Sequence, residues 1–499
     1  MGKPSNQNIS SDASLKIERA SAIKLRVCHV ASTVEGAKWM VEQLRDLRDH
    51  YGCDVTAIVS GERGGLIDML RAEGIPYHVE YMKFGSLREM LQVPRAILRM
   101  ALFFRRERFD VVQTHLFFSM LIGRIAAWLA DVPVRLAMIP GPFHLEAHIS
   151  RWIDRATGWM ETAFIPSCVH TLRLYKEIGV ADDRLSLIYY GPDERNFIPE
   201  EVLPANIRAE YGWPADTPLI AKVAYFYPPL PKSRWVPPVI QERGVKGHEY
   251  LVRAAPLVLN EFPDAKFLLV GPGWFEHGEK HREEIKELVR TLGLEESVIF
   301  VGYRKDANRI LREADVAVQA SLTDNPAGTV EALLMECPTV ATRVGGMVDT
   351  VRDGETGVLV NPSDPDDMAR GILQMLRDRE RALSLGRAGR KLMLDRFTLH
   401  RAVKDLHELY LRLRFRRKRN FYNPPVSLWR LIVAIPVCCY LCFRVLFVDT
   451  YIPVYLPIHL ARLRYIPRRL FYRVRFLLSH ARGVAGRGRS FLRRLYKNS

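Results

Sequence analysis

The sequence predicts an α/β protein built from two doubly wound domains, each with a parallel sheet. A chain of 499 residues is too long for one ordinary core, so two domains and appendages are expected. Short apolar runs alternate with segments of helical spacing, and this alternation restarts after a polar, proline-bearing stretch at 199–218. Strands that are apolar throughout are typical of a parallel sheet covered on both faces. Two such domains in tandem face a cleft at the carboxyl ends of their strands, where ligands bind.

The first domain is expected over 23–195. It follows a polar leader at 1–22, which is expected to be disordered and which has no apolar signal-peptide core. Apolar runs predict strands at 25–30, 54–59, 110–114, 134–139 and 185–189. Apolar residues at helical spacing predict helices at 39–47, 87–104 and 119–129.

The second domain is expected over 196–400. Its predicted strands lie at 219–224, 266–270, 298–301, 315–319, 339–342 and 357–360. A proline-rich insertion at 227–244 follows the first of these strands, and its prolines favour a semi-rigid, non-helical loop. Both a lid over the cleft and a surface excursion fit this composition. A segment at 401–419 is expected to form a helix that returns to the first domain.

The net charge of +17 is confined to the C-terminal part of the chain. Residues 411–499 hold 20 Lys and Arg and one acid, whereas the first 410 residues carry a net charge of −2. The tail at 420–499 interleaves arginines with aromatic and aliphatic residues, and its uncharged run at 431–443 has 13 residues, short of the roughly 20 that a spanning helix needs. This composition favours peripheral or monotopic attachment to an anionic membrane surface. A re-entrant or spanning hairpin, a nucleic acid partner and a protein partner are the alternatives.

The seven cysteines are scattered and odd in number, which is typical of a reducing compartment and not of a disulfide framework. We therefore expect the protein in the cytoplasm, on the inner face of the cell membrane. A nucleic-acid-binding protein is disfavoured, because the body of the chain is not basic and carries no nucleic-acid-binding motif.

The segment 321–356 carries the clearest candidate binding residues. It is predicted to run from a strand through a loop into a helix that begins near Gly328, Thr329 and Glu331. Unpaired backbone N–H groups at a helix start suit a phosphate, and Glu331 can accept two hydroxyls of a ribose. Lys246 stands at another predicted helix start and can neutralise a diphosphate. In the alternative interpretation, Glu331 only offsets the helix dipole and Lys246 is a solvated surface charge.

Several short motifs occur in an order that resembles the retaining glycosyltransferases of family 4, which have the GT-B architecture of two Rossmann-like domains. The resemblance covers about 375 residues, from Val27 to Arg401. The motifs are DVVQTH at 110–115, YGPD at 190–193, VKGH at 245–248, GPG at 271–273, FVGY at 300–303, EALL at 331–334, TVATRVGG at 339–346 and GVLVNP at 357–362.

The resemblance implies a site for a nucleotide-sugar donor in the second domain. Lys246 would hold the donor diphosphate and Glu331 the ribose. The family's second acid, which touches the sugar, is assigned to Asp324, because Thr323 stands where the E-x7-E pair expects a glutamate. The family's arginine before the lysine is displaced, since Tyr225 occupies its place. Arg243 and Arg234 of the insertion are the candidates to replace it.

In the first domain, the resemblance implies that backbone amides near Gly36 approach phosphate and that a histidine lies near the transferred sugar. His115 and His144 are the two candidates, and for each a capping or core role is the alternative. No metal and no cofactor are expected, because Lys246 and helix dipoles would stabilise the leaving nucleotide.

The implied reaction is transfer of a sugar from a nucleotide-sugar to a hydroxyl acceptor, with retention at the anomeric carbon. The basic, aromatic tail suggests a lipid-linked or membrane-proximal acceptor, as in cell-surface polysaccharide or glycolipid assembly. Two other functions remain possible for the same fold: a non-catalytic nucleotide-sugar-binding or scaffolding protein, and a nucleotide-sugar epimerase-like enzyme.

Overall fold

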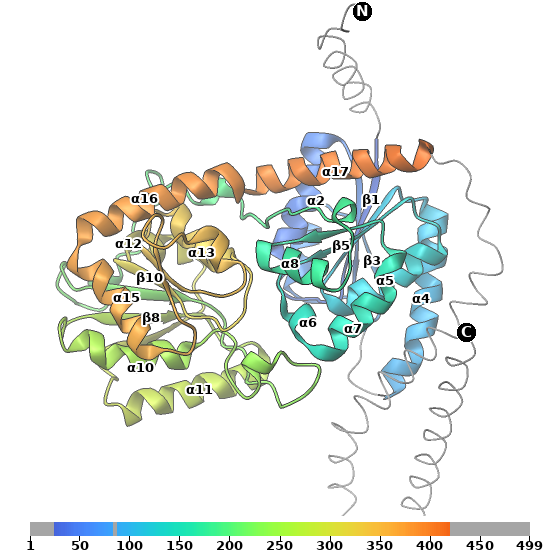
Figure 1. Cartoon of the computed structure of the whole chain (residues 1–499). Coiled ribbons are helices and arrows are strands. Elements are labelled where there is room, and N and C mark those ends of the chain that lie inside the picture. Colours follow the sequence, from blue (N-terminus) through green and yellow to red (C-terminus); the bar gives the residue numbers. More distant parts are fainter. Residues whose placement is uncertain (1–23, 83–86, 420–499) are drawn as a thin grey trace, which may run out of the picture. The chain divides into compact units, whose positions relative to one another are not determined.

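The computed structural model describes residues 24–82 and 87–419 and contains two parallel six-stranded sheets (Figure 1). Their strand orders are β3-β2-β1-β4-β5-β6 and β12-β11-β10-β7-β8-β9. In both sheets the order reverses beside the first strand, as in doubly wound folds. The predicted α/β class and the two Rossmann-like domains are therefore confirmed. The predicted leader and the basic, aromatic tail lie outside the described residues.

The first sheet is built from short strands, buried except for β3, that match most of the predicted apolar runs. They are β1 (Arg26–Ala31), β2 (Asp54–Val59), β3 (Tyr77–Val79), β4 (Val111–His115), β5 (Val134–Ile139) and β6 (Ala163–Pro166). Its helices are α2 (Lys38–Tyr51), α3 (Gly65–Ala72), α4 (Leu87–Glu107), α5 (Phe117–Leu129), α6 (Phe143–Glu146), α7 (His148–Thr157) and α8 (Val169–Glu177).

The strand predicted at 185–189 is wrong. This segment runs beside β6 but pairs with it only through one isolated bridge, between Leu185 and Phe164. Two further backbone hydrogen bonds follow, from Ser186 N to Phe164 O (3.0 Å) and from Ile188 N to Pro166 O (3.2 Å). The edge of the sheet is β6, which sequence reasoning missed because it has only four residues and ends in a proline.

The second sheet comprises β7 (Leu219–Val223), β8 (Lys266–Val270), β9 (Val298–Gly302), β10 (Val316–Gln319), β11 (Thr339–Thr342) and β12 (Val358–Val360). Its helices are α9 (Ile207–Glu210), α10 (His248–Leu259), α11 (Phe275–Thr291), α12 (Ala307–Glu313), α13 (Ala327–Leu334), α14 (Met347–Thr350), α15 (Pro365–Arg377) and α16 (Arg379–Arg396). All six predicted strands of this sheet are present, with ends that differ by at most one residue.

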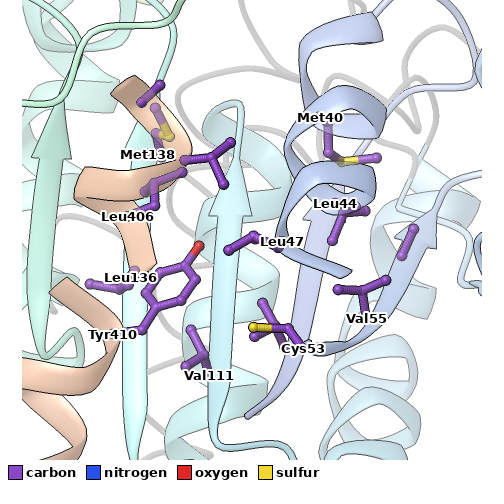
Figure 2. Packing of buried hydrophobic residues seen from close by; sticks show 14 of the residues in the cluster. Met40, Leu44, Leu47, Cys53, Val55, Val111, Leu136, Met138, Leu406 and Tyr410 are labelled. Atoms are coloured by element: carbon purple, nitrogen blue, oxygen red, sulfur yellow. The ribbon is translucent and has the colours of Figure 1, made fainter. Parts of the chain in front are cut away.

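The last described helix, α17 (Leu399–Arg419), belongs to the core of the first domain. Its Leu406 and Tyr410 pack beside Leu136, Met138 and Val111 of the first sheet (Figure 2). The chain thus crosses between the domains twice. The two crossings touch, because Leu399 N donates to Pro192 O (3.0 Å) and a Cβ on Gly191 would lie 2.2 Å from the backbone of Thr398.

Among the described residues, no helix is both long enough and apolar enough to cross a lipid bilayer.

Candidate functional site

Lys246 is positioned by the glycine that follows it, at the start of α10. Gly247 has φ +62°, and a Cβ there would lie 2.1 Å from the carbonyl oxygen of Ala320. Only glycine allows this backbone conformation and this close approach without strain. The loop before α10 is therefore pressed against the loop after β10, where Asp324 lies.

Asp324 forms an ion pair with Lys246 and is held by two further groups. Ser321 Oγ donates to Asp324 Oδ2 (2.9 Å), and Asn325 N donates to Oδ1 (2.9 Å). Burial opposes the charge of Lys246, but Asp324 outweighs it and raises the lysine pKa. A cation and an anion thus lie together at the carboxyl end of the second sheet, where this fold class binds its ligands.

The turn Gly345–Gly346 fixes the Asp324 loop from the other side. Gly345 has φ +51°, and a Cβ there would lie 2.1 Å from the Asp324 carbonyl oxygen. That oxygen also accepts a hydrogen bond from Gly346 N (3.1 Å). The double glycine that follows β11 therefore acts as a backbone support for the acidic residue.

Glu331 lies in the second turn of α13 and is partly exposed. Its carboxylate has no hydrogen bond or ion pair with any residue of the described part of the chain. Burial raises its pKa to about 7, while Lys38 and Lys246 oppose the shift and Glu42 adds to it. A carboxylate held in a desolvated place without a partner is typical of a ligand-binding position.

Gly328 and Thr329 shape the start of α13. A Cβ on Gly328 would lie 2.7 Å from the Gln319 side chain, so the missing side chain lets the helix start approach β10. Thr329 is buried, and its hydroxyl binds Pro326 O (2.6 Å) and Thr350 Oγ1 (2.7 Å). The Thr329 hydroxyl is therefore already hydrogen-bonded to other groups of the second domain.

Gly36 and Arg243 lie apart from the Lys246–Asp324 pair. Gly36, in the loop after β1, has φ +65° and faces the Trp274 ring, which a Cβ would approach to 3.7 Å. Arg243 is exposed, and its guanidinium donates to Ser363 Oγ (3.5 Å). Arg243 therefore points toward the loop after β12.

Of the two candidate histidines, His144 reaches the cavity beside Asp324, whereas His115 does not line it. His115 is fully buried and bonds to His29 Nδ1 (3.2 Å) and the Tyr190 hydroxyl (3.3 Å). Burial and then the neighbouring His29 lower the His115 pKa well below its usual range. His115 is therefore a neutral member of the first domain's interior.

His144 is oriented by a buried charge network that sequence reasoning missed. Its Nε2 lies 3.1 Å from Asp154 Oδ2, and Arg124 binds the same carboxylate (2.7 Å) as well as Glu161 (2.9 Å). Burial favours protonation of Asp154, but Arg124 and His144 outweigh it and lower its pKa to about 2. No sequence spacing indicated this network, since its members come from three separate helical or loop segments.

A second missed group is Lys222, which lies fully buried in the middle of β7. Its Nζ has no hydrogen-bond acceptor within residues 24–82 and 87–419. Burial and then the charge of Lys246 lower its pKa to about 7, while Asp324 and Glu249 oppose the shift. A lysine inside an otherwise apolar predicted strand was the signal that could have found it.

A cavity of about 520 Å³ adjoins the Lys246–Asp324 pair and is lined by both domains. The first domain contributes the segments 116–117 and 139–144, and the second contributes 227–228, Leu230, 245–246, Trp274 and 323–325. Next to the cavity, Thr323 Oγ1 donates to Glu146 Oε2 (2.7 Å) and so connects α6 to the Asp324 loop. The predicted cleft is therefore present, with His144, Lys246 and Asp324 on its wall.

Both domains of the chain match known protein families. Residues 35–191 match the family model described as "Glycosyl transferase 4-like domain", and residues 240–378 match "Glycosyl transferases group 1". A protein of Bacillus subtilis named as the glycosyltransferase EpsD is 31% identical over 166 residues, which cover 33% of this chain and 42% of that protein.

Two longer matches extend over most of the described residues. The UDP-Gal:alpha-D-GlcNAc-diphosphoundecaprenol alpha-1,3-galactosyltransferase of Escherichia coli is 23% identical over 407 residues, covering 78% of this chain and 97% of that enzyme. The crystal structure of Anabaena HepE in complex with UDP and glucose has a TM-score of 0.63 at 18% identity, covering 77% of this chain and 99% of that one.

Proposed function

Because the chain belongs to the family 4 glycosyltransferases of GT-B fold, we propose that it transfers a sugar, with retention, from a nucleotide-sugar to a hydroxyl of a lipid-linked acceptor. The chain is a glycosyltransferase; the donor, the acceptor and the stereochemistry are the proposal. The observation that carries it is the arrangement of Lys246, Asp324 and the unpartnered Glu331 at the carboxyl end of the second sheet.

On the donor side, Lys246 provides the positive charge for a diphosphate. When the diphosphate binds, the lysine has two anionic neighbours, so Asp324 is released in part from its ion pair and its oxygens can accept hydroxyls of the donor sugar. Glu331 accepts two ribose hydroxyls, which supply the hydrogen bonds that its carboxylate lacks in the unliganded protein. Hydrogen bonds to a charged group contribute about 1.5–3 kcal/mol each.

During transfer, the bond between the anomeric carbon and the diphosphate oxygen breaks, and the sugar acquires oxocarbenium character, as in glycoside hydrolysis. Negative charge grows on the diphosphate, and Lys246 stabilises it in a partly desolvated place. The acceptor oxygen bonds to the anomeric carbon, and its proton passes to the departing diphosphate oxygen. His144, oriented by Asp154, lies on the cavity wall for contact with the transferred sugar.

Two similarities support the substrates proposed. HepE was crystallised with UDP and glucose, and the name of the Escherichia coli relative gives UDP-Gal as donor and a diphosphoundecaprenol-linked sugar as acceptor. We propose in addition that the basic tail at 420–499 holds the enzyme on the cytoplasmic face of an anionic membrane, and that neither a metal nor a cofactor takes part.

The experiment tests UDP-, GDP- and ADP-sugars with the full-length chain. Calorimetry measures binding of each donor, and NMR measures its turnover. Lys246→Ala and Glu331→Ala should each weaken binding of the accepted donor by at least tenfold, as expected for loss of a hydrogen bond to a charged group. The exposed α17 residues Lys404 and Glu408 supply matched controls, Lys404→Ala and Glu408→Ala, which should bind as the wild type does.

The panel also separates the alternatives. The anomeric proton coupling of the product reports retention or inversion. Donor binding without transfer to any acceptor extract would favour a scaffolding protein, and conversion of the donor to its epimer would favour an epimerase-like enzyme. Failure of every nucleotide-sugar to bind a folded chain would refute the proposal.

A further inference from the structure

The proline-rich insertion, residues 227–244, is an ordered part of the cavity. Its Val236 and Ile240 are buried against Leu322 of the second domain. The Gln241 side-chain amide donates to Ser233 O (3.0 Å) and Val236 O (3.1 Å). Prolines further restrict the backbone, so the segment is held in one conformation by its own contacts.

The same segment reaches the first domain. Ile149 N, at the start of α7, donates to Arg234 O (3.1 Å). The Trp235 ring meets the Phe117 ring edge to face, with 6.4 Å between centroids. The insertion therefore bridges the two sides of the cavity, which agrees better with a fixed wall than with a surface excursion.

The wall that the insertion completes is apolar. The insertion contributes Tyr227, Pro228 and Leu230 to this wall. The first domain faces them with six side chains that have no charged group. These are Leu116, Phe117, Ile139, Pro140, Pro142 and Phe143. Three ionisable side chains also line the cavity, Lys246, Asp324 and His144. The Phe117 ring lies 5.8 Å from the His144 ring and the Tyr227 ring lies 5.9 Å from Lys246 Nζ, so the apolar wall borders these groups.

The apolar wall limits what can occupy the cavity beyond the ionisable side chains. A diphosphate or a sugar placed along the apolar wall would lose hydrogen bonds to water without gaining new ones, which is unfavourable. An apolar group placed there gains from the removal of its surface from water. A volume of about 520 Å³ is within the range of pockets that enclose a small organic ligand.

We propose that the proline-rich insertion and the loops after β4 and β5 form the acceptor-selecting wall, and that it binds an alkyl or isoprenoid chain attached close to the reacting hydroxyl. This inference rests on the proposed glycosyl transfer and deepens it, because it assigns the apolar wall of the cavity to the acceptor. The reacting hydroxyl lies between His144 and Asp324, and the chain extends along Leu230 and Phe143.

The test uses n-butyl, n-hexyl and n-octyl β-D-glucosides, below their micelle concentrations, as probes of the full-length chain in the presence of UDP. Binding is measured by calorimetry. Each added methylene that is buried should strengthen binding, by up to about fourfold. Leu230→Asp and, independently, Phe143→Asp should remove this dependence on chain length. Phe143 is 38% exposed, so its replacement is compatible with folding even if Leu230→Asp is not.

Val239→Asp is the matched control, because Val239 is an exposed residue of the same insertion that does not line the cavity. It should keep the dependence on chain length. A flat dependence in wild-type protein that binds UDP overturns the inference alone. If UDP does not bind, the probes are measured with GDP and ADP, and absence of binding by all three nucleotides counts against the proposed function. A dependence that persists in both aspartate variants places the alkyl chain elsewhere, for example on the tail, and also overturns the inference.

Discussion

Replacing the buried Lys222 by methionine should stabilise the protein and remove a pH dependence. The Nζ of Lys222 has no hydrogen-bond acceptor among the described residues, and its charge is opposed by burial and by Lys246. Methionine has a similar length and no charge, so it can fill the same buried space. The predicted gain in stability comes from removal of an unfavourable charge, since no new contact is made.

The magnitude follows from the pKa of Lys222, which is lowered from 10.5 to about 7 in the folded protein. The unfolded chain therefore binds more protons than the native chain between these two values, and wild-type stability rises with pH in this window. At 1.36 kcal/mol per pKa unit, the cost of Lys222 is about 4 kcal/mol at pH 7 and about 2 kcal/mol at pH 9.

The assay is urea unfolding of full-length wild type and Lys222→Met at pH 7, 8 and 9. The variant should be more stable at pH 7, and its advantage should fall by about half at pH 9. Lys404→Met, on the exposed face of α17, should change stability by no more than about 0.5 kcal/mol at any pH. Lower stability of Lys222→Met at pH 7, or an advantage that is independent of pH, would refute the reasoning.

Three further substitutions test the site and its support. Glu331 has a pKa of about 7, so its ionised fraction, and with it wild-type donor affinity, should rise about tenfold from pH 6 to pH 8. Calorimetry should find this rise absent in Glu331→Gln; the same rise in the variant would assign it to another group. Gly247→Ala places a Cβ 2.1 Å from a carbonyl oxygen and should weaken donor binding at least tenfold through displacement of Lys246. An unchanged dissociation constant would contradict this. Asp154→Asn removes one of the two carboxylates that neutralise the buried Arg124 and should lower the free energy of unfolding by about 3 kcal/mol, measured in urea. A loss under 1 kcal/mol would show that the ion pair of Asp154 with Arg124, which orients His144, is dispensable for folding.

The fold could be predicted from the sequence wherever most residues of a strand are apolar and buried. The bounds of β2, β5, β8 and β11 agree with the predicted ones, although Asp54, Arg135 and Lys266 lie within them, because the buried residues of each strand dominate its pattern. The prediction failed at the sheet edge, where hydrogen bonding and not composition distinguishes β6 from the wrongly predicted strand at 185–189. The three-residue β3 is too short for any periodicity to detect.

The candidate site could be predicted in part, because local motifs place residues at the ends of elements. The motif at 245–248 located Lys246, and the acid-bearing loop located Asp324, which the fold brings into contact. The roles assigned to these residues stay predictions. Local motifs could not distinguish His144 from His115, since both are buried and the packing of distant loops decides which of them lines the cavity. Sequence reasoning also missed Lys222, because its full burial without a hydrogen-bond partner depends on the packing around β7.

The packing of α17 on the first domain has a consequence for biosynthesis. Residues that complete the first core, from Leu399 to Leu413, are separated from its sheet by the whole second domain. Domains usually fold in the order in which they leave the ribosome. In this chain the second domain can complete its own contiguous core first, while the domain that is synthesised earlier must wait for its last helix. A nascent chain stalled near residue 397 would therefore carry one finished domain and, ahead of it, one with an open apolar face.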